Sequence, residues 1–191
     1  IFDLGGGTFD ISILRLTRGV FEVIATGGDS ALGGDDYDRA LADWVLQQTS
    51  ASTVTPGDKA QLKTAARAAK EALTTNESIA IEVQLALGNV HFDVKRADFE
   101  SVTAALTLRA LSAVRKSLRD AKLTPDEVQG VVMVGGSTRM PQIQKAVADF
   151  FGRAPLNNLN PDEVVALGAA MQANQLAGND TAGDLLLLDV I

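Results

Sequence analysis

The sequence predicts an α/β fold in which helices flank a mixed sheet and an inserted unit combines a helix with a β-hairpin. Two observations predict the main body: strand-like and helical apolar patterns alternate along 191 residues, and residues 131–134 form the all-apolar run of a strand covered on both faces. A third observation predicts the insertion, because strict alternation at residues 79–87 is typical of a hairpin. An apolar share of 46% is enough for a packed core.

The chain begins with a strand, a tight glycine turn and a second strand. Residues 1–2 lead into residues 3–10 (DLGGGTFD), and residues 9–16 lead out with Phe9, Ile11 and Ile13 on one face. Successive glycines accept positive φ and carry no Cβ that would block a ligand, and their N–H groups can form a nest for phosphate.

Polar side chains flank this glycine turn. Asp3 precedes it, and Thr8 and Asp10 follow it. Two carboxylates beside a phosphate can hold a hydrated Mg²⁺ or orient a water molecule, as phosphoryl transfer requires. The alternative from these residues alone is an ordinary glycine hairpin with two solvated aspartates.

The next elements are a strand at residues 20–26, a loop between two glycine pairs (27–28 and 33–34) and a helix at residues 35–48, in which we expect Trp44 to lie in the core. Residues 49–57 form a loop, and residues 58–73 a second helix.

The hairpin that follows turns at Gly88 and Asn89 into a strand at residues 90–94. Its His91 has no partner motif, and we expect it on the surface without a function.

The last third of the chain is mainly helical. Residues 96–121 are expected to form two consecutive helices, residues 124–127 (TPDE) a capped helix start, and residues 141–151 a helix ended by Gly152. A final helix runs from residue 160 to 177. We expect its buried positions to be Val164, Leu167, Met171 and Leu176.

Composition excludes several classes of function. A formal charge of −7, from 17 basic and 24 acidic residues, disfavours non-specific nucleic-acid binding. The chain has no cysteine, so thiolate and iron–sulfur ligation do not reside here. No apolar run approaches the roughly 20 residues that span a bilayer. Since the chain opens inside a strand without Met, we expect it to be part of a longer protein.

A second glycine-containing motif follows the strand at residues 131–134. Gly135, Gly136 and Ser137 allow the backbone to lie against a base or ribose, and Arg139 can stack its guanidinium on adenine. The alternative is a plain strand-to-helix turn with a surface arginine.

Four segments together resemble four motifs of the DnaK-type seventy-kilodalton heat-shock chaperones, in the same order. They are residues 3–10, 134–141 (VGGSTRMP), 160–163 (NPDE) and 184–190 (DLLLLDV). That family belongs to the actin, sugar kinase and heat-shock ATPase superfamily. Residues 18–38 are most similar to its bacterial branch that serves iron–sulfur cluster assembly.

This resemblance implies the second lobe of an actin-like (ribonuclease H-like) ATPase. Residues 1–32 and 104–183 would form its base subdomain, residues 33–103 the inserted upper subdomain, and residues 184–191 the start of an interdomain linker. The family's first phosphate loop belongs to the other lobe, so this chain would hold half an active site. For the leucine run at the end, the alternative is a buried terminal strand.

The resemblance also implies site residues. Asp3 and Thr8 would serve catalysis, and Asp3 and Asp10 would hold the cation, Mg²⁺ with K⁺ as a second candidate. The phosphates of ATP or ADP would lie on Gly5, Gly6, Gly7 and Thr8. Adenosine would lie on Lys70, Thr74, Gly135, Gly136, Ser137, Arg139 and Asp162.

Two of these assignments have alternatives. Lys70 could be an exposed helix lysine, and its neighbours Arg67, Glu71 and Thr74 depart from the family pattern. Asp162 lies near a helix start, and a capping role there is compatible with a role in the pocket.

The function implied is a cytoplasmic chaperone that couples ATP hydrolysis to binding and release of a client polypeptide. The client would bind a substrate domain absent from this chain. A J-domain co-chaperone and an iron–sulfur scaffold protein are the further partners implied, with no nucleic acid and no membrane. Two alternatives remain: a small-molecule kinase of the same superfamily, and a non-catalytic actin-like interaction module.

Overall fold

A mixed five-stranded sheet forms the base of the molecule. The computed structural model describes residues 1–17, 20–49, 54–86, 88–156, 160–161, 163–178 and 186–188. The strand order is β6-β1-β2-β3-β7. The antiparallel pairs are β1–β2 and β2–β3, while β6 and β7 add to the two edges in parallel, so the predicted mixed sheet is confirmed. The strands are β1 (Phe2–Leu4), β2 (Phe9–Thr17), β3 (Val20–Asp29), β6 (Met133–Val134) and β7 (Leu186–Leu188).

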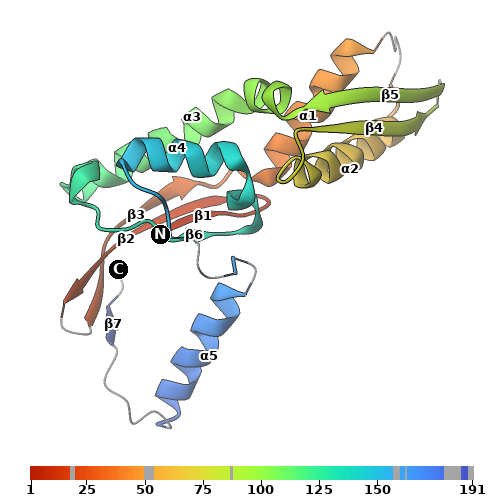
Figure 1. Ribbon diagram of the computed structural model, residues 1–191. Helices are drawn as coiled ribbons and strands as arrows, with labels where there is room; N and C mark the ends of the chain where they lie inside the picture. Colours follow the sequence, from red (N-terminus) through yellow and green to blue (C-terminus); the bar gives the residue numbers. More distant parts are fainter. Residues whose placement is uncertain are drawn as a thin grey trace.

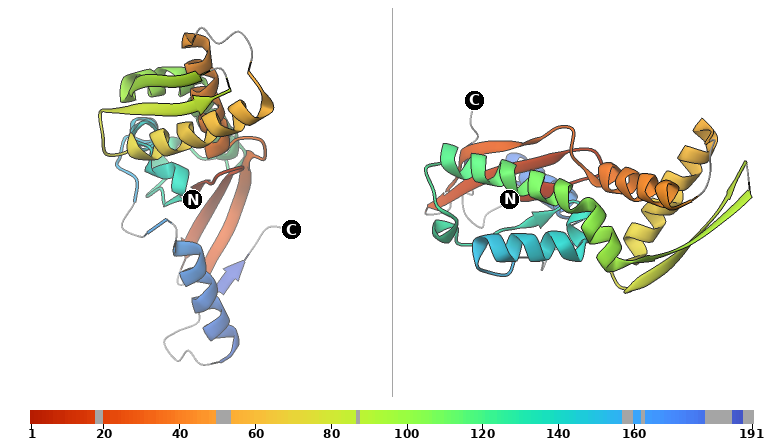
Figure 2. Two further views of the ribbon diagram at one scale, coloured as in Figure 1. Left: turned by 90° about the vertical axis from the view of Figure 1, so that its right-hand side faces the viewer. Right: turned by 90° about the horizontal axis from the view of Figure 1, so that it is seen from above.

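Two helices, α3 (Arg96–Asp120) and α4 (Pro141–Phe151), cover one face of this sheet (Figures 1 and 2). Phe2, Phe9 and Ile143 are among the buried side chains of the core. The helix α3 is continuous, so the expectation of two helices is wrong: residues 96–120 contain no Gly or Pro to interrupt it. The helix α4 ends as predicted, at Gly152 with φ of 64°.

The second group of elements lies at one end of the sheet (Figure 2). It consists of α1 (Gly34–Gln48), α2 (Pro56–Ala72), β4 (Ser78–Leu85) and β5 (Gly88–Lys95). Trp44 is half-buried and meets Phe92 edge to face, with ring centroids 5.0 Å apart. The predicted hairpin is present, but Gly88 already pairs with Leu85, so the turn precedes Gly88 instead of containing it.

The start of α2 lies two residues before its predicted position. Pro56 occupies the first turn, and the hydroxyl of Thr55 accepts the Asp58 N–H at 3.1 Å. This capping contact, together with the fixed φ of proline, allows the helix to begin inside the segment that composition assigned to a loop.

Gly27 and Gly28 belong to β3, not to the predicted loop. A Cβ on Gly27 would lie 2.2 Å from the Ser117 hydroxyl of α3, and one on Gly28 would lie 2.1 Å from the Phe9 carbonyl. These glycines therefore permit close packing of α3 and β2 on β3, which local composition does not distinguish from a flexible connection.

The C-terminal helix α5 (Val164–Leu176) lies on the side of the sheet opposite to α3 and α4 (Figure 1). The predicted burial of Leu167, Met171 and Leu176 is wrong, since all three are exposed, and Val164 is only half-buried. Apolar periodicity identifies one side of a helix but not the element that covers it. Elsewhere the TPDE sequence yields only a 3₁₀ turn, η1 (Pro125–Glu127).

Candidate functional site

The turn between β1 and β2 leaves part of its backbone open. Gly5 donates its N–H to the Thr8 carbonyl at 3.1 Å, so this donor closes the turn and is not available to a ligand. Gly6 and Gly7 are exposed, and a Cβ on either would meet no atom within 4 Å. The open N–H groups of these two glycines are the part of the predicted nest that can receive a phosphate.

Asp3 and Asp10 lie directly opposite each other in the β1–β2 pair. Burial raises the pKa of Asp3 above its ordinary value of 3.8, and the charge of Asp10 raises it further. Thr8 donates to Asp10 at 3.1 Å. A cation would relieve the repulsion between the two carboxylates, and hard oxygen ligands suit Mg²⁺ or K⁺.

Within the described residues no group of three or more His, Cys, Asp or Glu could surround a metal ion. An ion held by Asp3 and Asp10 would therefore take its other ligands from water and phosphate, which is how Mg²⁺ usually binds beside a nucleotide.

The N-terminus of α1 packs against the same turn. The N–H of Gly34 donates to the Gly5 carbonyl at 2.9 Å, and the N–H of Asp35 donates to the Gly6 carbonyl at 2.8 Å. A Cβ on Gly33 would lie 2.4 Å from the Gly6 oxygen, so only glycine fits there. The first two donors of α1 thus hold the carbonyl side of the turn.

The motif after β6 meets this turn from the other side. The backbone passes Gly135, with φ of 86°, into the 3₁₀ helix η2 (Gly136–Arg139). A Cβ on Gly135 would lie 2.8 Å from a carboxylate oxygen of Asp3. The buried hydroxyl of Ser137 donates to the Gly5 carbonyl at 2.9 Å. The two predicted nucleotide motifs are therefore adjacent in space.

Two residues of that motif, Gly136 and Arg139, are exposed. Arg139 donates to the side-chain oxygen of Asn160 at 3.1 Å. The neighbouring site residue of the sequence analysis, Asp162, lies outside the described residues.

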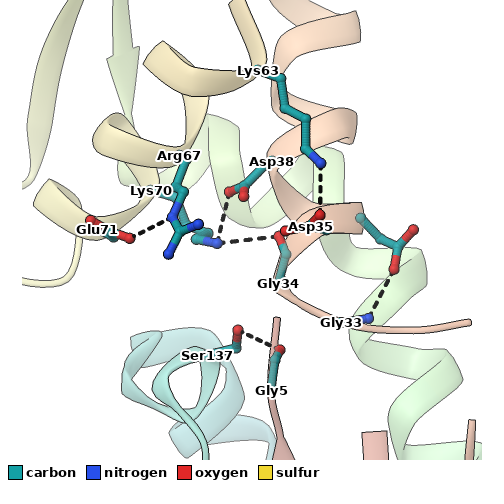
Figure 3. A network of polar contacts seen from close by, with 11 residues as sticks. Gly5, Gly33, Gly34, Asp35, Asp38, Lys63, Arg67, Lys70, Glu71 and Ser137 are labelled. Carbon is teal, nitrogen blue, oxygen red and sulfur yellow. Dashed lines mark hydrogen bonds and ion pairs between the residues drawn. The ribbon is translucent and has the colours of Figure 1, made fainter. Parts of the chain in front are cut away.

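Lys70 completes the arrangement from α2. Its ammonium donates to the Gly34 carbonyl at 3.2 Å (Figure 3). A Cβ on Gly34 would lie 2.4 Å from the Ser137 hydroxyl, 3.1 Å from the Lys70 nitrogen and 3.5 Å from the Gly5 oxygen. Three segments remote in sequence therefore meet at Gly34. We call this meeting point of Gly5, Gly34, Lys70 and Ser137 the Gly34 junction.

The alternative of Lys70 as an exposed helix lysine is wrong, because the residue is buried. Thr74, one helical turn further, is half-buried, and its hydroxyl makes no hydrogen bond within the described part of the chain. Lys70 therefore contacts the Gly34 junction, whereas no described contact links Thr74 to it.

The sequence pattern predicts Gly33 and Gly34 only as the edge of a loop, and their structural role could not be read from it. A Cβ on Gly34 would collide with Ser137, and one on the adjacent Gly33 would collide with Gly6. The available signal was a glycine pair immediately before an amphipathic helix, which indicates a close backbone approach as readily as a loop.

Exposed ion pairs border the junction (Figure 3). The Lys63 ammonium lies 2.7 Å from the Asp35 carboxylate, whose pKa it lowers, and Arg67 pairs with Glu71 at 3.0 Å. Arg67 and Glu71, the residues that depart from the family pattern, therefore neutralise each other on the surface of α2.

A cavity of about 380 Å³ lies elsewhere, between β2 and the end of α3. Its lining includes the apolar side chains of Ile11, Val114, Leu118 and Phe151. It lacks the converging glycines and the paired carboxylates, so the chemistry of a nucleotide site favours the Gly34 junction over this cavity. Within the described residues, no helix has the length and apolar content that a bilayer crossing requires.

The chain also matches known proteins over its whole length. A family model described as Hsp70 protein matches residues 1–191. The chain is 71% identical over 191 residues to a chaperone protein HscA homolog of Variovorax paradoxus (strain S110), and 69% identical to one of Acidovorax ebreus (strain TPSY). A homolog of the same name from Methylobacillus flagellatus is 59% identical over 192 residues. All of this chain is matched, and it spans 31% of the length of each of these relatives.

Proposed function

This chain belongs to the Hsp70 family, and on that premise we propose that it is the second lobe of a nucleotide-binding domain and supplies half of an ATPase site. The observation that carries the proposal is the Gly34 junction. There the β1–β2 turn, η2 and Lys70 are held together by direct contacts.

The phosphates of ATP or ADP would lie on the open backbone of Gly6 and Gly7, with Thr8 beside them. Asp3 and Asp10 would hold a hydrated Mg²⁺, with K⁺ as the alternative ion, and Asp3 would also orient the attacking water. The ion would neutralise charge that develops on the phosphates. Gly135 would serve mainly by allowing its backbone to approach β1, since a Cβ there would lie 2.4 Å from the Leu4 oxygen. Gly5 would contribute its carbonyl, which accepts hydrogen bonds from Ser137 and Gly34.

Adenosine would lie against the η2 backbone. Gly136 leaves room for the ribose or base, Ser137 fixes the backbone, and the exposed Arg139 would stack on adenine. Lys70 would approach from α2. Asp162 and Thr74 remain predicted members of this pocket.

The chain would divide into the units that the sequence suggests. Residues 1–32 and 104–183 would form the base subdomain, residues 33–103 the upper subdomain, and residues 184–191 the start of a linker to a substrate domain. The pairing of β7 with β3, through Phe21 and Leu187 among others, supports a linker that docks as an edge strand.

In the intact protein this lobe would couple ATP hydrolysis to the grip on a client polypeptide, with a J-domain co-chaperone as partner. The similarity of residues 18–38 to the iron–sulfur-assembly branch supports a role in that process, with an iron–sulfur scaffold protein as a further partner and the cytoplasm as location. Since the chain has no cysteine, any such role would not involve ligation of the cluster by this lobe.

ATP hydrolysis by the intact protein tests the proposal. A chaperone ATPase should hydrolyse ATP slowly, faster with an added client peptide and unchanged with a sugar, and Asp3→Asn should abolish turnover. Phosphate transfer to a sugar or acetate would support the kinase alternative instead. Nucleotide binding without peptide-stimulated hydrolysis would support an actin-like interaction module.

A further inference from the structure

A buried ion pair joins Lys70 of the Gly34 junction to Asp38, a residue to which the proposed function gives no role. The ammonium of Lys70 lies 2.7 Å from one carboxylate oxygen of Asp38, and the two side chains are 10% and 1% exposed (Figure 3). Beyond this ion pair, neither Asp38 oxygen has a hydrogen-bond partner in the described part of the chain. Such a buried, poorly satisfied carboxylate requires an explanation.

Stability alone does not explain the pair. Removing a carboxylate and an ammonium from water costs free energy that their attraction only partly offsets, and a well-packed apolar pair is often as stable. Burial raises the pKa of Asp38 despite the neighbouring Lys70, which reflects this cost. The other charged pairs on the same helices, Lys63–Asp35 and Arg67–Glu71, are much more exposed.

The hydrogen bonds of the Lys70 ammonium indicate what the pair can do. A lysine ammonium has three hydrogens. The Asp38 carboxylate and the Gly34 carbonyl, at 3.2 Å, take two of them. The nitrogen also lies on the side of Gly34 that faces Ser137, since a methyl group on Gly34 would contact both. Among the described residues the ammonium has no third acceptor, so one N–H remains for a ligand at the junction.

We propose that Asp38 is a positioning residue whose buried carboxylate fixes the Lys70 ammonium at the Gly34 junction, so that the remaining N–H meets the nucleoside. This inference rests on the proposed nucleotide site. A flexible lysine side chain loses rotamer freedom when it binds a ligand, and this loss weakens binding. Because Asp38 already holds the Lys70 side chain in one position, the entropic cost of binding is smaller.

The test compares Asp38→Asn with the unaltered intact protein. Asparagine keeps the shape and removes the charge, so Lys70 is no longer fixed. The affinity for ADP, measured by calorimetry, should fall about tenfold, the worth of one hydrogen bond to a charged group. In ATP hydrolysis KM should rise while kcat changes less than about twofold, because Lys70 does not face the γ-phosphate. Asp149→Asn breaks an exposed pair with Lys145 and should change neither value.

A second background separates positioning from a structural role. In Lys70→Met, the further change Asp38→Asn should leave the ADP affinity unaltered, because there is no ammonium to position. The double variant carries no buried charge at this pair, so it should fold even if Asp38→Asn does not. An equal loss of ADP affinity from Asp38→Asn in both backgrounds would overturn the proposal.

The outcome also separates this inference from the proposed function. If the unaltered intact protein binds ADP but Asp38→Asn binds it equally well, Asp38 has no positioning role and the nucleotide site stands. If the unaltered intact protein binds no ADP, the proposed function itself is contradicted, and the inference with it.

Discussion

The hydroxyl of Ser137 donates a 2.9 Å hydrogen bond to the carbonyl of Gly5 across 132 residues of sequence. The same carbonyl accepts the N–H of Gly34 at 2.9 Å. One oxygen atom of the β1–β2 turn therefore joins η2 and α1. A change at either donor should affect the β1–β2 turn even though neither donor belongs to it.

Ser137→Ala tests the first of these contacts. The variant removes one buried hydrogen bond, so unfolding free energy should fall by about 1 kcal/mol and ADP affinity by about fivefold. Denaturant titration and calorimetry measure the two effects. Ser112→Ala is the matched control, since the exposed Ser112 hydroxyl donates to the Leu108 carbonyl of its own helix. ADP affinity that is equal in both variants would remove Ser137 from the site.

Gly34→Ala tests the close approach at the junction. The added methyl group would lie 2.4 Å from the Ser137 hydroxyl, and the displaced groups should cost about 1–3 kcal/mol of stability. ADP binding should fall by more than about tenfold.

Gly57→Ala provides the contrast for that experiment. A methyl group on Gly57, in the first turn of α2, would have its nearest neighbour 3.7 Å away. Alanine is the better helix former, so this variant should be more stable by about 0.5–1 kcal/mol. Similar stability changes for Gly34→Ala and Gly57→Ala would contradict the junction geometry.

Asp3→Asn tests the carboxylate pair through its dependence on pH. A raised native pKa means that the folded protein binds the proton of Asp3 more tightly than the unfolded chain does, so the ionised form costs stability. Without added cation, Asp3→Asn should raise the melting temperature at pH 7. The gain should be full above the raised pKa and vanish once the pH is below the ordinary value of 3.8.

Mg²⁺ with ADP should reverse the order, stabilising the unaltered protein more than Asp3→Asn. The exposed Asp43→Asn serves as control for the lost charge. A lower melting temperature of Asp3→Asn at pH 7 without cation would show that Asp3 is a structural residue instead.

Met171→Gln tests the exposed face of α5. Met171 is 75% exposed, so the change should alter the unfolding free energy of the 191-residue chain by less than about 0.5 kcal/mol. Ile143→Ala, in the core, should cost about 2–5 kcal/mol. A comparable cost for both variants would mean that the α5 face is covered in solution.

Leu187→Pro tests the pairing of β7 with β3. Proline has no N–H and cannot donate to the ladder, so amide exchange at residues 20–22 should become faster in the intact protein. Leu187→Ala keeps the N–H and should retain the protection. If β7 is the docked linker, peptide stimulation of ATP hydrolysis should also fall in the proline variant. Unchanged exchange at residues 20–22 would refute the pairing.

The elements and their order follow from local sequence. The helix from Pro141 to Phe151 with its Gly152 cap and the β4–β5 hairpin were predictable, because periodicity and capping are properties of short segments. The mixed pairing of the sheet joins segments that are distant in sequence, and periodicity alone does not determine it. The sequence also predicts that two glycine-containing motifs bind a nucleotide, and the structure brings these two motifs into contact.

The remaining features depend on contacts between distant segments. Gly27 and Gly34 are glycines because Ser117 and Ser137 approach them from far along the chain, and no local pattern contains that information. The exposure of Met171 depends on what lies against α5, and the burial of Lys70 on its pairing with Asp38. Local periodicity reports only the preference of an element, not its partner.

Amide chemical shifts of the intact protein during titration with Mg²⁺ and ADP test the nucleotide site most directly. If the nucleotide binds at the Gly34 junction, the shift changes should be concentrated at residues 5–8, 33–36 and 135–139 and at Lys70. No shift changes are expected around the cavity beside Val114 and Leu118. Shifts that gather around that cavity and spare the glycines of the Gly34 junction would contradict it.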